Sequence, residues 1–196
     1  MNDAQRRDLV DLRIASQARD PQQTQFLTKR LLGGLDFYGA LAVTLQPVYT
    51  FLDIFESYYP DEGWIRKMLV SITSYGVAPD DQVAEMALNQ TFPAPGCGNF
   101  LKAVYDITQA MQKKHTSEAR IGYMTSALVN AVMAELVEAW YGQRDEAWTY
   151  QRENVGDPDS LELSYLFWTD PETAALDTTC WLEIAERLEK ALVRQG

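Results

Sequence analysis

Residues 117–141, SEARIGYMTSALVNAVMAELVEAWY, determine how the rest of the chain can fold. The stretch is rich in alanine, leucine, methionine and glutamate, which are good helix formers, and it contains no proline. Its apolar residues recur at steps of three and four, which indicates one buried face of a helix: Ile121, Met124, Leu128, Val132, Leu136 and Ala139. We therefore expect a long central helix around which neighbouring helices pack.

Glu135 interrupts this apolar face, because it lies between Val132 and Leu136. A carboxylate on a buried face costs free energy unless it is protonated or paired with a cation. One interpretation is a binding site for a cation, an arginine or a small ligand, with Glu138 one turn further along. The other, which we favour, is an ion pair or a position at the edge of the face that reaches solvent.

The sequence predicts no metal site and no cofactor around Glu135. Metal sites in helical bundles combine glutamates with a Glu-x-x-His motif, whereas the segment from Glu135 to Glu138 contains no histidine. The only histidine, His115, follows two lysines at the end of an expected helix, where a cation is stabilising. No phosphate-binding glycine loop, catalytic triad or zinc-ligand spacing occurs, so we assign no catalytic residues and favour a non-catalytic protein.

Seven further helices are expected around this central one. Capping residues, prolines and glycines set their ends, as at Asp20-Pro21 and at Gly76. The expected ranges are 2–19, 21–32, 35–58, 64–75, 79–89, 99–115 and 178–194. The chain is therefore predicted to be all-α, a single-domain orthogonal bundle of about eight helices over residues 1–196. Its first helix, within residues 1–20, is basic and weakly patterned, so it can be mobile.

Charge and cysteine content narrow the expected partners and compartment. The chain has 28 acidic and 17 basic residues, a formal net charge of −11, which repels DNA and RNA phosphates. This charge either keeps the protein dispersed in water or attracts a basic partner. Cys97 and Cys180 have no CxxC context, so no zinc site or disulfide framework is predicted, and the cytoplasm is the expected location.

No secretory signal and no membrane span are expected. The first residues lack an apolar core with a small-residue cleavage site. Residues 37–52, FYGALAVTLQPVYTFL, are uncharged but shorter than a spanning helix, and they contain Gln46 and Pro47. A buried core helix is favoured over attachment to a membrane surface.

Cys97 is the cysteine with a chemical interpretation. It lies in the segment PAPGCGN, just before the helix that Asn99 is expected to cap. A helix N-terminus lowers the pKa of a thiol, and flanking glycines expose the sulfur, so the thiol would be reactive. An inert loop cysteine is the competing interpretation, and it is the one we favour.

Aromatic residues are concentrated in a highly charged segment near the end of the central helix: Trp140, Tyr141, Trp148, Tyr150, Tyr165, Phe167 and Trp168. A location in the core is one interpretation, and it applies to most aromatic residues of the chain. A small bundle cannot bury all of them, however, and exposed tryptophan and tyrosine beside arginine and glutamate are typical of protein interfaces. We therefore hypothesise a protein–protein interaction module, an adaptor, assembly factor or inhibitor, that docks through residues 140–168. The expected partner is another protein, and one interpretation is that it has a basic surface. Association of the chain with itself into a homo-oligomer is a further interpretation.

The alternative is a ligand-binding helical bundle or a small lyase. Its apolar pocket would lie between helices 35–58 and 117–141 and would contain Glu135. The sequence alone names neither the partner nor the ligand.

Overall fold

The computed structural model describes residues 1–80, 82, 85, 90, 92–142 and 179–195. These residues form seven helices and no strand: α1 (Asp3–Gln17), α2 (Pro21–Gly33), α3 (Phe37–Tyr58), α4 (Trp64–Tyr75), α6 (Cys97–Met111), α7 (Ser117–Gly142) and α10 (Thr179–Gln195). The predicted all-α bundle is confirmed. The helix expected over residues 79–89 falls largely outside the described residues, so seven helices are seen where the sequence predicts about eight.

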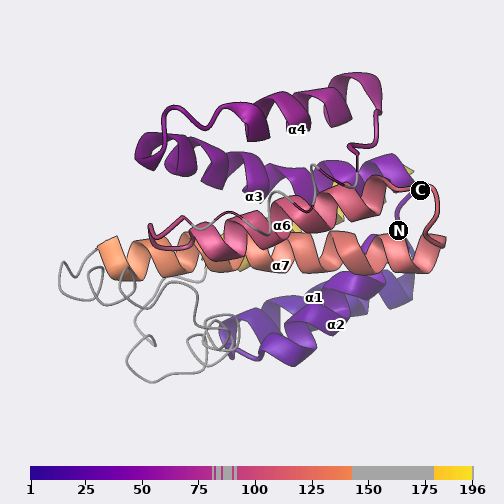
Figure 1. Ribbon diagram of the computed structural model, residues 1–196. Coiled ribbons are helices and arrows are strands. Elements are labelled where there is room, and N and C mark those ends of the chain that lie inside the picture. Colours follow the sequence, from indigo (N-terminus) through magenta and orange to yellow (C-terminus); the bar gives the residue numbers. More distant parts are fainter. Residues whose placement is uncertain (81, 83–84, 86–89, 91, 143–178, 196) are drawn as a thin grey trace.

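The central helix of the sequence is also central in space (Figure 1). α7 runs through the middle of the bundle and packs against α6, α3 and α2. The α1–α2 hairpin lies on one side of α7, and α4 lies on the outer side of α3 (Figure 1). α10 packs against α1 and α3, so the last helix closes the bundle against the first.

Local sequence explains where most of these helices begin and end. Asn2 and Gln5 form a reciprocal capping box at the start of α1. Asp20 caps α2 by accepting a hydrogen bond from the Gln23 amide, with Pro21 as the first helical residue. α4 ends at Gly76, whose φ of 62° lies in the left-handed region that favours glycine.

The apolar face predicted for α7 lies in the core of the bundle. Four of its six residues are buried: Met124, Leu128, Val132 and Leu136. Nearby, the ring of Phe100 in α6 contacts the rings of Phe51 and Phe55 in α3, with centroid distances of 5.2 and 5.1 Å. Full burial of each such side chain contributes about 1.5–3 kcal/mol to folding, so this cluster is a major source of stability.

The apolar stretch 37–52 lies in α3 and contributes to the core, as predicted. Val48, Phe51 and Leu52 are fully buried there. Among the described helices, none is both long enough and apolar enough to cross a membrane.

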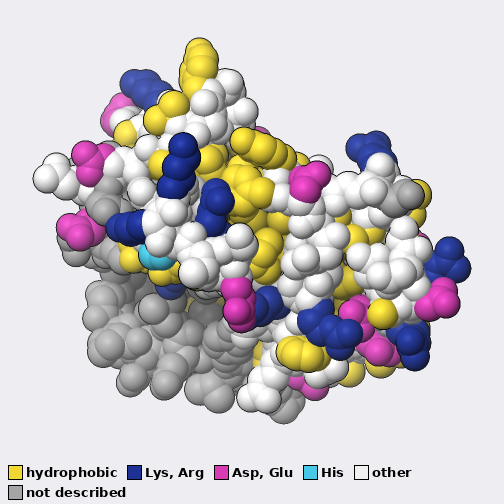
Figure 2. Space-filling model, turned by 90° about the vertical axis from the view of Figure 1, so that its right-hand side faces the viewer, with side chains coloured by type: hydrophobic (Ala, Val, Ile, Leu, Met, Phe, Trp, Pro, Cys, Tyr) yellow, Lys and Arg dark blue, Asp and Glu magenta, His cyan; other side chains and the backbone are white. Residues whose placement is uncertain are grey.

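Exposed hydrophobic side chains occur at the end of the bundle where α3 begins and α4 ends. Tyr38, Tyr75 and Val77 are exposed there. Figure 2 views the molecule from this side and shows hydrophobic side chains gathered among charged ones. This end lies opposite the C-terminal end of α7, so it offers control positions for tests of that end.

Gly96 allows the start of α6 to lie close against α7. Its φ of 77° is in the left-handed region, and it precedes the first residue of α6. A Cβ at this position would overlap the carbonyl oxygen of Ala134 and lie 2.9 Å from Cζ of Phe51. Glycine is therefore required here both by backbone conformation and by packing.

Replacing Gly96 with alanine is expected to lower the free energy of unfolding by about 2 kcal/mol or more, because it adds backbone strain and a clash with α7. The matched control is Gly98→Ala at the second residue of α6, where a Cβ meets no atom within 4 Å. That variant should be about 0.5–1 kcal/mol more stable than the wild type. Urea unfolding followed by circular dichroism measures both, and equal effects at the two positions would refute the packing argument.

Candidate functional site

The C-terminal end of α7 brings together the aromatic and acidic residues that the sequence singles out. Trp140 and Tyr141 are half-buried, and their rings meet edge to face with centroids 4.6 Å apart. Such aromatic pairs add about 0.5–1.5 kcal/mol beyond their buried area. Three other predicted docking residues, Trp148, Tyr150 and Trp168, lie outside the described residues.

Glu138 connects this end of α7 to α3. Its Oε1 accepts a hydrogen bond from the hydroxyl of Tyr58, in the last turn of α3, at 3.3 Å. Burial, followed by the charge of Glu138, raises the pKa of Tyr58, so the phenol remains a donor at neutral pH. Next to it, the hydroxyl of Tyr59 accepts a hydrogen bond from the Ala94 amide at 2.9 Å.

The charged residues that act on Glu135 are Glu183 and Arg187, which both lie on α10. Burial, followed by the charge of Glu183, raises the pKa of the Glu135 carboxyl to about 7, and the charge of Arg187 partly opposes both effects. Arg187 is already paired with Glu183 at 3.2 Å, and no described residue forms an ion pair with Glu135. The carboxyl is therefore about half protonated at neutral pH, and it can either donate or accept a hydrogen bond.

Cys97 is the first residue of α6 and is fully buried. Burial, followed by the charge of Glu138, raises the pKa of its thiol to about 12. The expectation that flanking glycines expose the sulfur is therefore wrong: Gly96 brings the chain inward against α7 instead. A buried neutral thiol is a poor nucleophile, so Cys97 behaves as a core residue.

His115 lies just after α6 and is held by neighbouring side chains. Its Nε2 is 3.1 Å from Oε1 of Gln109, and its ring packs against Tyr123 with centroids 5.0 Å apart. Within the described ranges, no three histidine, cysteine, aspartate or glutamate side chains come together in a way that could hold a metal ion.

A buried polar network between α6 and α7 was not predicted from the sequence. Asp106 is fully buried, pairs with Lys102 and accepts a hydrogen bond from the hydroxyl of Ser126 at 2.6 Å. One turn along α7, Oδ1 of Asn130 accepts a hydrogen bond from Nδ2 of Asn99 at 3.2 Å. Because each of these groups has a partner, the network fixes how α6 and α7 align rather than forming an open site.

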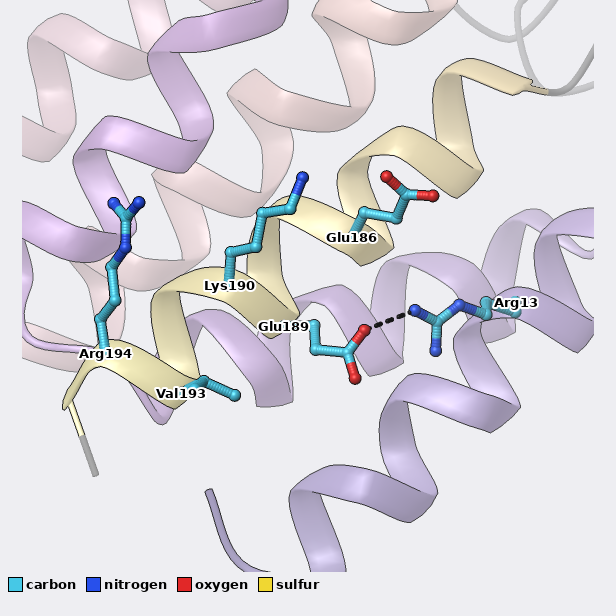
Figure 3. Close-up of a pocket in the computed structure, with 6 residues that line it drawn as sticks. All are labelled: Arg13, Glu186, Glu189, Lys190, Val193 and Arg194. Atoms are coloured by element: carbon cyan, nitrogen blue, oxygen red, sulfur yellow. Dashed lines mark hydrogen bonds and ion pairs between the residues drawn. The ribbon is translucent and has the colours of Figure 1, made fainter.

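A groove lined by described residues lies elsewhere, between α1 and α10 (Figure 3). It has a volume of about 510 Å³ and is lined by Arg13, Glu186, Glu189, Lys190, Val193 and Arg194. Nη2 of Arg13 and Oε2 of Glu189 form an ion pair across it at 2.8 Å. Sequence periodicity gives no sign of this groove, because its two helices are 176 residues apart at this pair.

The raised pKa of Glu135 predicts a pH dependence of stability. Between pH 4.5, the ordinary pKa, and pH 7, the folded state binds more protons than the unfolded chain, so the free energy of unfolding falls as pH rises. Glu135→Gln removes this penalty. The variant should match the wild type at pH 5 and exceed it by about 2 kcal/mol at pH 8, measured by urea unfolding.

Glu118→Gln is the matched control for that test, since Glu118 lies on the same helix with an exposed side chain. It should leave the difference between pH 5 and pH 8 unchanged. If Glu135→Gln and the wild type gave parallel stability curves over this range, Glu135 would have an ordinary pKa.

Comparisons with protein-family models, with curated proteins and with solved structures found no match to this chain.

Proposed function

We propose that this protein is a non-catalytic protein–protein interaction module that docks a partner at the C-terminal end of α7. The observation that carries the proposal is the edge-to-face pair of Trp140 and Tyr141 in the last turn of α7, the helix that also carries Glu135 and Glu138. Tryptophan and tyrosine contribute most to binding at protein interfaces, where they supply a large contact area with few rotatable bonds.

The chemistry of this end favours a basic partner. Glu138 and the partly protonated Glu135 provide hydrogen-bond acceptors, and aromatic ring faces attract arginine and lysine. The formal net charge of −11 steers basic surfaces toward the molecule and repels nucleic acid phosphates. A basic protein segment, rich in arginine, is the partner that fits these properties.

A cytoplasmic adaptor, assembly factor or inhibitor is the class of protein that we assign to this module. Neither Cys97 nor Cys180 is part of a disulfide bond, which is compatible with a reducing compartment.

The double substitution Trp140→Ala/Tyr141→Ala should abolish capture of a basic partner in affinity purification followed by mass spectrometry from the native cell. Glu138→Lys should also abolish it, because it reverses a charge at the docking end. Tyr75→Ala is the control, since Tyr75 is exposed at the opposite end of the bundle. Circular dichroism should show equal helicity for all variants.

Capture of the same basic protein by every variant would contradict the proposal. Loss of helicity in the double variant would show that Trp140 and Tyr141 are core residues, and Glu138→Lys would then decide the matter. Capture by a folded Glu138→Lys variant at wild-type level would exclude docking at this end.

A ligand-binding bundle is the second candidate, and the raised pKa of Glu135 is the observation that favours it. A carboxyl that is half protonated near pH 7 suits a polar group on an otherwise hydrophobic ligand. In a thermal-shift screen with hydrophobic ligands, a shift seen for the wild type and lost in Glu135→Gln would support this candidate. Equal shifts for the two proteins, or none, would remove it.

A further inference from the structure

The outer face of α1 and α10 exposes aliphatic side chains that a folded monomer leaves in water. Val10 and Ile14 of α1 are 53% and 58% exposed, and Val193 of α10 is 57% exposed. Val10 and Ile14 are one turn apart, so they share a face of α1. Together with the groove between the two helices, these side chains form a surface that resembles the rim of an interface more than an ordinary polar helix face.

Along one row of α10, the charged residues are segregated by sign. Glu186, Lys190 and Arg194 follow one another at steps of four, and Figure 3 shows them on the same side of α10. The acid is in the N-terminal half and both bases are in the C-terminal half. Among the described residues, neither Lys190 nor Arg194 forms an ion pair, whereas Glu183 and Arg187 on the adjacent row pair at 3.2 Å.

We propose that this face binds the same face of a second copy of the chain, with the two α10 helices antiparallel about a twofold axis that crosses the exposed side of α10 at the level of the buried Leu188. The face consists of Val10, Ile14, Glu186, Lys190, Val193 and Arg194. With the axis at Leu188, Glu186 of each copy lies opposite Lys190 of the other, since both are two residues from the axis. Arg194 of each copy then lies near Glu183 of the other.

Charge complementarity selects a second copy as the occupant. A twofold axis repeats every contact, so each opposite-charge pair occurs twice in the dimer. A parallel arrangement would instead place Lys190 against Lys190, and like charges in contact are unfavourable. The aliphatic side chains of Val10, Ile14 and Val193 lose exposure to water at the same time, which adds a favourable term without directional preference.

This proposal does not depend on the docking function of the α7 end, because it uses other helices and none of the residues tested there. The test is sedimentation velocity on the full chain from about 5 to about 200 μM, where a dimer shows concentration-dependent association. The wild type should dimerise. Glu186→Lys and Lys190→Glu should each weaken dimerisation at least about tenfold, and the double variant should restore it to within about threefold.

The two single variants distinguish pairing of Glu186 with Lys190 from general repulsion between acidic molecules, because they change the net charge in opposite directions. Glu186→Lys changes the formal net charge from −11 to −9, and Lys190→Glu changes it from −11 to −13. General repulsion therefore predicts that the first variant associates more strongly and the second more weakly. That pattern, or a wild type that stays monomeric throughout, would overturn the proposal.

Lys67→Glu is the control, because Lys67 is exposed on α4, across the bundle from α1 (Figure 1). It also takes the net charge to −13, so it should dimerise as the wild type does. Circular dichroism of all four variants should match the wild type. If the double variant failed to restore association while remaining folded, pairing of Glu186 with Lys190 would be excluded.

Discussion

Burial of α7 between α6, α3 and α2 is the constraint on which the rest of the bundle depends. Small residues make it possible, because Ala127, Ala131 and Ala134 are fully buried and let neighbouring helices approach closely. At Gly96 the approach leaves no room for a Cβ. Hydrophobic contacts are non-directional, so they do not fix how α6 and α7 are aligned with each other. The hydrogen bond between Asp106 and Ser126 fixes this alignment.

Much of this arrangement follows from the sequence alone, since periodicity and capping are local. The buried face of α7 and the starts of α2 and α4 need no more than neighbouring residues to predict. The start of α6 differs: Asn99 has the chemistry of a cap, yet the helix begins at Cys97. Before that start, the chain at Gly96 lies close against Ala134 of α7. A contact between segments so far apart in the sequence cannot be predicted from a local pattern. The same contact buries Cys97, which its flanking glycines suggest is exposed.

The candidate sites also differ in whether local sequence or tertiary contacts define them. Glu135 can be recognised from the sequence, because a charge in an apolar face breaks a local pattern. Its electrostatic neighbours cannot, since Glu183 and Arg187 belong to a helix that only the folded chain brings alongside. The groove between α1 and α10 is invisible for the same reason: Arg13 and Glu189 meet across the whole length of the chain. Local patterns identify unusual residues, and tertiary contacts decide what those residues can do.

The two surfaces use charge in different ways, and the net charge of −11 alone does not determine which partner fits either surface. Near the end of α7, Glu138 accepts a hydrogen bond from Tyr58 and is followed by the Trp140–Tyr141 ring pair, so this end favours a cation that can also contact a ring face. Along α10, acids and bases are separated on one ridge, so the surface favours a partner with the reverse order, which an antiparallel copy has. Total charge sets how strongly the molecules repel at long range, but at contact the order of charges along a helix decides which partner fits.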